Sequence, residues 1–352
     1  MIKQIKLVLF LGINTLISNA QQKDSLNSKL SIDFSGYVDT YFTAASSYGN
    51  DEKLEPYLYN YTKNNKAEIN LALFKTQLTF RNLYAKIGIQ TGTYAKTNYP
   101  KAQQWLNEAT IGLKISPKSA IEAGVLPSYI GFETATAATN LTASRSLLAE
   151  NSPYYMTGIK LNHQFDEKWF LAVMLSNGWQ TISNTLNKLP AFGTQLQYKP
   201  NENTLYNWST FIGDVTTNGN FTTRIFSNFY VDKTWKNGMK TQLGFDMGWQ
   251  QRNTTSSWAI WYSPVLIQQY QFNTKWAIAY RIEYYHDIEN TLIQPTHLLP
   301  FKTIGNSLNL DYNLSKKIKC RTEGKWYHAS ENIFTNNTKN NLYWLTTLSY
   351  SF

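Results

Sequence analysis

The chain has 352 residues and a formal net charge of +10, yet only 16% of its residues are charged and 15% are aromatic. Beyond residue 20 no stretch provides the run of about 18 apolar residues that a membrane-spanning helix needs, so the sequence excludes a helical membrane protein. Lys and Arg are spread along the chain without a basic cluster, which argues against a nucleic-acid partner. The single cysteine, Cys320, excludes an intrachain disulfide and a thiolate metal cluster.

The N-terminus has the three parts of a secretory signal. A positively charged start precedes an apolar run from Leu7, and small side chains lead up to Ala20. The apolar run is too short to span a bilayer. We therefore expect residues 1–20 to be removed, the mature chain to begin at Gln21, and residues 21–30 to form a short polar leader.

Residues 31–352 alternate between short segments rich in aromatic and β-branched residues and polar connections. This pattern predicts an all-β fold, a single transmembrane, antiparallel, up-and-down β-barrel of about sixteen strands. The predicted strands are 31–43, 68–80, 83–91, 107–116, 119–126, 153–164, 168–177, 191–199, 204–213, 222–232, 239–250, 257–268, 274–285, 302–313, 316–328 and 342–352. The segment 257–268 has the weakest strand pattern, because Pro264 interrupts it.

Short and long connections alternate along the chain. Short turns are expected near 81–82, 116–118, 165–167, 200–202, 236–238, 273 and 314–315, and longer polar segments near 44–67, 92–106, 127–152, 178–190, 214–221, 251–256, 286–301 and 329–341. An even-stranded barrel in an outer membrane has this arrangement, with the short turns and both termini facing the periplasm. A soluble β-sandwich has no reason to sort its connections by length.

Charged side chains gather on the polar faces of the predicted strands. Between Lys316 and Tyr327, five consecutive charged side chains share one face, where contact with lipid would cost about 2–4 kcal/mol for a midplane Lys or Arg. Such a face must line water. The predicted pore-lining residues are Lys75, Arg81, Lys86, Lys114, Lys160, Arg224, Arg281, Glu283, Lys317, Lys319, Arg321, Glu323 and Lys325. Because basic residues outnumber acidic ones in this set, we expect a weak anion preference.

The segment 127–152 differs from the other connections, since it is long and rich in Ala, Thr and Ser. From Thr142 to Glu150 the pattern permits a short helix with Thr142 as its N-cap. Folded into the barrel, this loop would narrow the lumen and place Arg145 and Glu150 at the constriction. An ordinary surface loop is the alternative.

The last eleven residues form the clearest strand of the chain. Apolar and polar side chains alternate from Leu342 to Phe352, with aromatic residues at both ends of the apolar face. A tilted strand needs about 9–11 residues to cross a bilayer. This segment resembles the closing strand of outer-membrane barrels, whose terminal aromatic residue is read by the barrel-assembly machinery.

Three short motifs point to one family. They are Gly36-Tyr37-Val38-Asp39-Thr40-Tyr41 in the first strand, Gly124-Val125-Leu126-Pro127 before the long loop, and Ser144-Arg145-Ser146 with Ala149-Glu150-Asn151-Ser152-Pro153-Tyr154-Tyr155 at its end. With these motifs the sequence resembles the OmpL-like β-barrel porins. The resemblance implies a channel in outer-membrane lipid for the passive diffusion of small hydrophilic solutes, without a cofactor, and it leaves a homotrimer open. The Asn-, Lys- and Tyr-rich composition is similar to that of Bacteroidota sequences.

Two other function classes stay open from the sequence. One is an outer-membrane barrel enzyme of the lipase or protease type, although the four histidines share no metal-ligand spacing and no nucleophile motif accompanies them. The other is a carbohydrate-binding β protein, in which exposed Trp and Tyr would stack on sugars. Because the histidine spacing and the missing nucleophile motif argue against catalysis, we expect neither catalytic residues nor a metal site.

Overall fold

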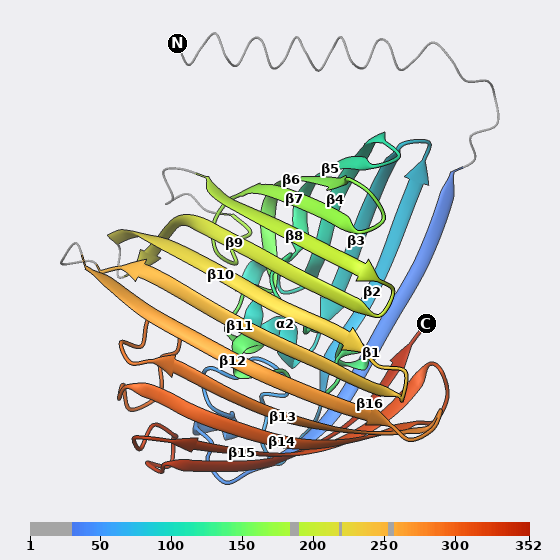
Figure 1. Cartoon of the computed structure of the whole chain (residues 1–352). Helices are drawn as coiled ribbons and strands as arrows, with labels where there is room; N and C mark the ends of the chain where they lie inside the picture. Colours follow the sequence, from blue (N-terminus) through green and yellow to red (C-terminus); the bar gives the residue numbers. More distant parts are fainter. Residues whose placement is uncertain (1–29, 184–189, 218–219, 253–256) are drawn as a thin grey trace, which may run out of the picture.

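The computed structural model describes residues 30–183, 190–217, 220–252 and 257–352. The predicted signal sequence at 1–20 and nearly all of the polar leader lie outside the described residues. The described residues form sixteen antiparallel strands in one closed barrel, in which each strand pairs with its neighbours in the chain and β1 also pairs with β16 (Figure 1). The expected barrel architecture is thus confirmed.

The strands β3 to β8 are the shortest, and β1, β2 and β9 to β16 are longer. Their bounds are β1 Ser31–Ala45, β2 Ala67–Phe80, β3 Leu83–Thr91, β4 Leu106–Ser116, β5 Ser119–Pro127, β6 Tyr155–Gln164, β7 Trp169–Ser176, β8 Ala191–Asn201, β9 Thr204–Thr217, β10 Asn220–Thr234, β11 Met239–Gln251, β12 Trp258–Gln271, β13 Trp276–Asp287, β14 Phe301–Asn313, β15 Ile318–Ala329 and β16 Asn340–Ser351. Short helical segments lie in the connections: η1 Asn50–Glu52, α2 Thr93–Asn98, η2 Lys101–Gln103, η3 Ala137–Thr139 and α3 Leu147–Glu150. None of the helices among the described residues is long and apolar enough to cross a membrane.

One predicted connection differs from the structure, and the strand with the weakest pattern is confirmed. The segment expected as a long loop near 214–221 is mostly strand, because β9 and β10 stay paired up to Thr217 and Asn220 and leave only 218–219 outside the described residues. The strand with the weakest pattern is present as β12. Its pairing with β13 skips Pro264, which has no N–H to donate.

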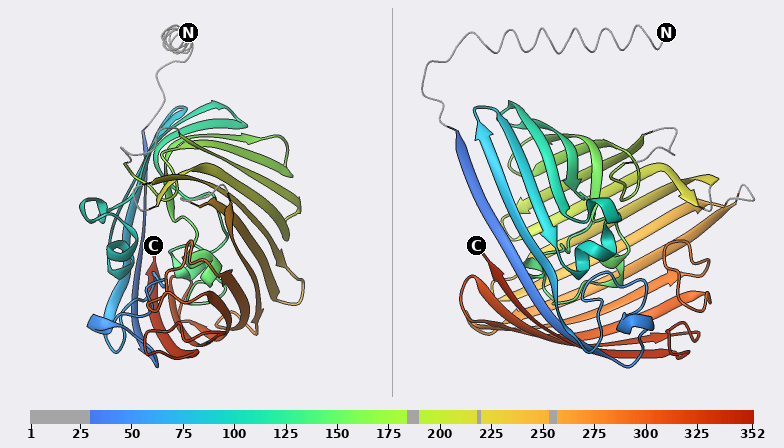
Figure 2. Two further views of the ribbon diagram at one scale, coloured as in Figure 1. Left: turned by 90° about the vertical axis from the view of Figure 1, so that its left-hand side faces the viewer. Right: turned by 180° about the vertical axis from the view of Figure 1, so that it is seen from behind.

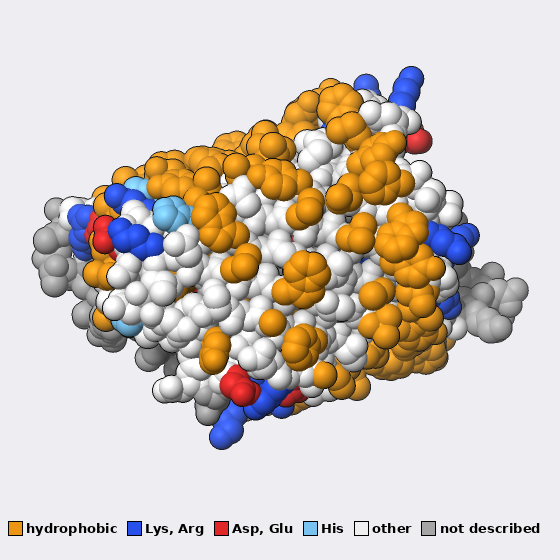
Figure 3. All heavy atoms as spheres, turned by 90° about the horizontal axis from the view of Figure 1, so that it is seen from below, with side chains coloured by type: hydrophobic (Ala, Val, Ile, Leu, Met, Phe, Trp, Pro, Cys, Tyr) orange, Lys and Arg blue, Asp and Glu red, His pale blue; other side chains and the backbone are white. Residues whose placement is uncertain are grey.

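The outer face of the barrel is apolar. Ile111, Ile159 and Leu308 are 69%, 57% and 56% exposed, and they alternate with inward-facing neighbours along their strands. In Figure 3 hydrophobic side chains spread across the wall, while most charged side chains lie towards its margins. A wall of this kind is suited to lipid, since period-2 alternation sends polar side chains inward.

The interior is partly filled at the end where the long connections lie. Residues from 46–66, 128–154, 288–300 and 330–339 pack with inner-wall side chains into one apolar cluster that includes Leu58, Leu147, Ile293, Phe301 and Phe334. Figure 2 shows the green segment that contains α3 inside the ring of strands. Much of the barrel is therefore occupied by its own loops.

Candidate channel and its constriction

The connection between β5 and β6, residues 128–154, lies against the inner faces of β12 to β15. The whole of α3 is buried, and it contacts β12 and β13. Along the loop, Gln269 Nε2 donates to the carbonyl oxygen of Leu141 at 3.0 Å, and the N–H of Ala143 donates to Asn309 Oδ1 at 3.0 Å. Side chains of the wall thus satisfy some of the backbone polar groups of this loop.

Arg321 of β15 fastens the first half of this loop. Its guanidinium donates to the carbonyl oxygens of Ala137 at 2.6 Å, Asn140 at 3.0 Å and Thr142 at 3.0 Å. The same guanidinium forms a bidentate pair with Asp311 of β14, with 2.7 Å from Nε to Oδ1 and 3.0 Å from Nη2 to Oδ2. The planar fork of Arg suits both tasks, because its five N–H groups diverge in fixed directions.

A second group of charges fastens the loop around α3. Arg281 donates to the Ser144 carbonyl oxygen at 2.7 Å and to Glu323 Oε1 at 3.0 Å. Glu323 and Glu283 accept the backbone N–H groups of Ser144, at 2.6 Å, and Leu147, at 2.5 Å. Lys325 Nζ lies 3.2 Å from Glu283 Oε1 and donates to the carbonyl oxygen of Arg145 at 3.2 Å. The charges of the wall thus compensate one another and also bond to the backbone of the loop.

The helix inside the loop begins later than the sequence suggests. Ser146 is the N-cap of α3, and its hydroxyl accepts the N–H of Ala149 at 3.2 Å. Thr142, the expected N-cap, instead accepts a hydrogen bond from Arg281 at 2.7 Å. Arg281 of the wall thus occupies the Thr142 hydroxyl that would otherwise cap the helix. The sequence pattern within the loop cannot reveal this contact.

Five of the residues expected to line the pore lie beneath this loop. Arg281, Glu283, Arg321, Glu323 and Lys325 point inward, as the strand phase predicts, but each is at most 2% exposed. Here the structure differs from the expectation. These charges bind the loop and one another, so that they do not face open lumen.

The opposite wall carries ion pairs that stay accessible. Lys75 of β2 lies 2.9 Å from Glu108 of β4, and Lys86 and Lys160, of β3 and β6, each lie 3.0 Å from Glu122 of β5. The three lysine side chains are 32%, 33% and 18% exposed, whereas the two glutamates are each 7% exposed. On this wall the lysine side chains are partly exposed, whereas their carboxylate partners are buried.

The remaining predicted pore residues are scattered. Arg81 lies in the turn between β2 and β3 and not on the barrel wall. Lys114 is exposed near the same end of the barrel, in β4. Arg224 is 7% exposed and lies over the rings of Trp179 and Trp261, at 4.9 and 5.5 Å. Lys317 and Lys319 follow the turn between β14 and β15, and Lys319 Nζ donates to the carbonyl oxygen of Ala138 at 2.9 Å.

Both constriction candidates lie within the inward loop and are buried. Arg145 is 5% exposed and lies over the ring of Tyr154 at 4.1 Å. Glu150 is 3% exposed and accepts from the N–H of Tyr59 at 2.8 Å and from the Tyr154 hydroxyl at 2.9 Å. Glu150 therefore ties the loop to the neighbouring connection 46–66.

Several residues that shape the interior carried no obvious signal in the sequence. Glu108 and Glu122 lie on polar strand faces, but nothing in the sequence marks them as partners of the lysines. Glu133 is a loop residue whose carboxylate accepts from the N–H and the hydroxyl of Ser146 and lies 3.7 Å from Arg281. Burial raises the pKa of the Glu133 carboxyl, and the nearby Arg281 opposes that rise.

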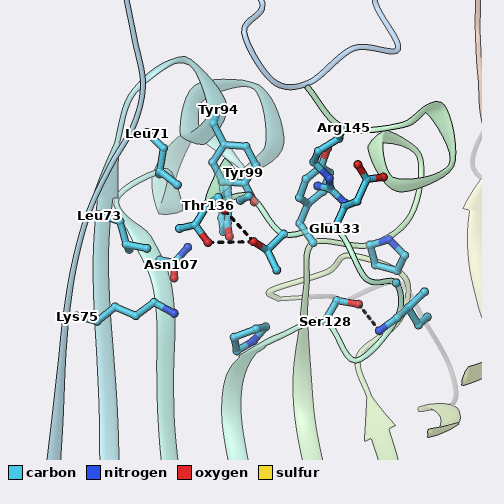
Figure 4. Close-up of a pocket in the computed structure, with 17 residues that line it drawn as sticks. Leu71, Leu73, Lys75, Tyr94, Tyr99, Asn107, Ser128, Glu133, Thr136 and Arg145 are labelled. Carbon is cyan, nitrogen blue, oxygen red and sulfur yellow. Dashed lines mark hydrogen bonds between the residues drawn. The ribbon is translucent and has the colours of Figure 1, made fainter. Parts of the chain in front are cut away.

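A cavity of about 240 Å³ lies between the loop and the accessible wall. Figure 4 shows Leu71, Leu73 and Lys75 of β2 on one side, Glu133 and Arg145 of the loop on the other, and Thr136 of the loop between them. Among the described residues, no cluster of three or more His, Cys, Asp or Glu side chains could hold a metal ion. The inward loop thus leaves a cavity between itself and the wall that carries the accessible lysines.

Residues 31–352 match the family described as "Putative beta-barrel porin-2, OmpL-like". The chain belongs to this family. The match covers the entire barrel, so the family resemblance inferred from the motifs is confirmed, and the protein is a porin of the outer membrane. No curated protein sequence matches the chain.

Solved structures with the same fold are outer-membrane porins and channels. The anion-selective porin from Comamonas acidovorans has a TM-score of 0.65 at 10% identity, covering 92% of this chain and 100% of its own. The outer membrane channel DcaP of Acinetobacter baumannii has a TM-score of 0.66 at 10% identity, with coverages of 94% and 100%. OmpT of Vibrio cholerae, in a trimer form, has a TM-score of 0.59 at 9% identity, with coverages of 92% and 99%. At these identities the likeness concerns the fold.

Proposed function

We propose that this porin conducts small hydrophilic solutes passively along the wall formed by β2 to β6. The observation that carries this proposal is the unequal exposure of the two sides of the interior. Lys75, Lys86 and Lys160 present accessible ammonium groups, whereas Arg281, Arg321 and Lys325 are sealed beneath the inward loop. Water and ions follow the side on which charged groups remain accessible.

The same wall supports a weak anion preference. Three partly exposed lysines pair there with two buried glutamates. Exposed ammonium groups favour anions in pores. The Debye length is about 10 Å at roughly 0.1 M salt, so the preference should weaken as salt concentration rises. One structure of the same fold is titled an anion-selective porin, which agrees with this direction.

Planar-bilayer recording of the refolded full-length protein tests the proposed function. We expect discrete conductance steps, and a reversal potential in a KCl gradient that indicates modest chloride preference and shrinks at high salt. Protein that has been heat-denatured before addition serves as the control. Absence of conductance steps from protein that migrates as a folded, heat-modifiable barrel would overturn the channel proposal.

We further propose that the protein forms a homotrimer, in which the chains contact one another through the wall of short strands. The strands β3, β5, β6 and β7 have only 9, 9, 10 and 8 residues, and they present exposed apolar side chains such as Ile87, Ile121, Ile159 and Leu175. The solved structure of OmpT of Vibrio cholerae, which has the same fold, is titled a trimer form. Mass measurement in detergent by light scattering tests this: three chains per particle support the proposal, and one chain contradicts it.

A barrel enzyme remains the second function to test, because Ser119 Oγ lies 2.8 Å from His163 Nδ1. Both residues lie where β5 and β6 meet the end with short turns, and the imidazole ring packs edge-on against Phe165. We propose that this pair is structural. Lipase and peptidase assays on wild type and Ser119→Ala should show no activity that depends on the serine. Hydrolysis lost in the variant would favour the enzyme.

A further inference from the structure

The cavity between the loop and the β2–β6 wall has the composition of a binding site. One side is apolar and aromatic, formed by Leu71, Leu73, Tyr94 and Tyr99, all at most 9% exposed. Its volume of about 240 Å³ is below the range of about 300–1,000 Å³ that is typical for drug-sized ligands. A solute of monosaccharide size is therefore the largest that it suits.

The polar groups around this cavity converge from both sides. Lys75 extends from β2 towards Asn107, and the loop contributes the hydroxyl groups of Thr134 and Thr136, which lie 2.9 Å apart (Figure 4). A hydroxyl or an amide can both donate and accept hydrogen bonds. The Asn107 amide and the two threonine hydroxyls can therefore bind the hydroxyl groups of a solute, and Lys75 can bind a negative charge.

The charge balance at the cavity favours an anionic solute. Glu133 also lines the cavity, but its side chain is fully buried and its carboxylate is already bound to Ser146 and paired with Arg281. The guanidinium of Arg145, which also lines the cavity, uses Nη2 to donate to the carbonyl oxygen of Ala149. Its Nε and Nη1 have no hydrogen-bond partner among the described residues. Arg145 therefore places a guanidinium at the edge of the cavity, with two donor nitrogens that have no acceptor in the described part of the chain.

We propose that this cavity is a binding site for a small hydroxylated carboxylate, a sugar acid being the representative chemistry. The carboxylate binds Lys75 Nζ, the hydroxyls bind Asn107 and Thr136, and the C–H surface of the solute packs against Leu73 and Tyr94. The site rests on the proposed function, because it lies on the proposed conduction path. With this site the channel would select its solutes by chemical class as well as by the sign of their charge.

Block of the KCl current by D-gluconate tests the site, with D-glucose as the uncharged probe. We expect gluconate to reduce the single-channel current saturably, and glucose to act much more weakly. Lys75→Gln should raise the half-blocking concentration about tenfold, since a hydrogen bond to a charged group contributes about 1.5–3 kcal/mol and 1.4 kcal/mol corresponds to a factor of ten. Glu108→Gln should lower it, because Lys75 then loses its competing carboxylate.

Lys86→Gln is the matched control. Lys86 lies on the neighbouring strand, has the same exposure and a similar pair with Glu122, and does not line the cavity. Block by gluconate should be unchanged in this variant. A linear, unsaturable effect of gluconate in a conducting channel, or equal loss of block in Lys75→Gln and Lys86→Gln, would overturn the site and leave the channel intact. Absence of conductance in the wild type would overturn both.

Discussion

Arg321 and Asp311 form a bidentate ion pair between neighbouring strands, and the same guanidinium donates to three carbonyl oxygens of the inward loop. Arg321 is 1% exposed and Asp311 is 2% exposed. One side chain thus joins the wall, its counter-charge and the loop that fills part of the barrel.

Removal of this guanidinium should release the loop. In Arg321→Leu, Asp311 becomes a buried carboxylate without its arginine, a loss that typically costs about 3–5 kcal/mol. We expect larger and noisier conductance steps and a lower temperature of heat-modifiable unfolding. Lys317→Gln, at an exposed position just before β15, should change neither the conductance nor the unfolding temperature. Unaltered conductance in Arg321→Leu would contradict the fastening role.

Accessibility to a water-soluble thiol reagent should distinguish the two sides of the interior. In a Cys320→Ser background, we expect Lys75→Cys and Lys160→Cys to react rapidly and to reduce the current. Lys325→Cys, at a position that is 1% exposed, should react slowly. Equal reaction rates at all three positions would mean that the loop does not cover the β13–β15 wall in the membrane.

Anion preference should depend on the accessible lysines more than on the buried basic residues. Triple replacement of Lys75, Lys86 and Lys160 by Gln should shift the reversal potential in a KCl gradient towards cations. The exposed Lys317 should add a smaller shift of the same sign. The sequence alone would have assigned this role to Arg321 and Lys325 as well, but their carboxylate partners Asp311 and Glu283 offset them. An unchanged reversal potential in the triple variant would refute the proposed path.

The pH dependence of stability should change in Glu133→Gln. Because burial raises the pKa of Glu133, the folded state binds its proton more tightly than the unfolded state does. The contribution of this group to stability is therefore fully present below the ordinary glutamate pKa and is lost as pH rises through the raised value. Relative to wild type, Glu133→Gln should unfold at the same temperature at pH 4 and at a higher temperature at pH 8. A variant that is less stable at pH 8 would show that the attraction to Arg281 outweighs the cost of burial.

Barrel closure should depend on Gly36, which pairs with the C-terminal residue. The N–H and the carbonyl oxygen of Gly36 each bond to the backbone of Phe352 at 3.0 Å, and a Cβ at position 36 would lie 2.1 Å from Cζ of the Phe352 ring. We expect Gly36→Val to reduce the fraction of heat-modifiable, assembled barrel. Gly324→Ala is the control, since its Cβ would lie 3.4 Å from the Trp344 ring, an ordinary contact. Whether the assembly machinery reads Phe352 stays a separate prediction, which deletion of that residue can test.

The sequence by itself determined the barrel. Strand phase and connection spacing depend on local alternation, so the inward direction of Lys75, Arg321 and Lys325 could be predicted from their neighbours alone. A helical turn near Arg145 and Glu150 could be predicted in the same way, although its N-cap could not. Local patterns fail there because Arg281, more than a hundred positions away in the chain, takes the hydroxyl of Thr142.

Only the tertiary structure decided which inward-facing charges remain accessible. Lys75 and Lys325 have the same strand phase and the same charge, yet one faces the cavity and the other lies under the loop. The difference arises because residues 128–154 cover the charged inner face of β13 to β15 and leave the lysines of β2, β3 and β6 partly exposed. Such a choice depends on pairings between distant segments, as with Glu323 and the N–H of Ser144, and period-2 alternation carries no information about them.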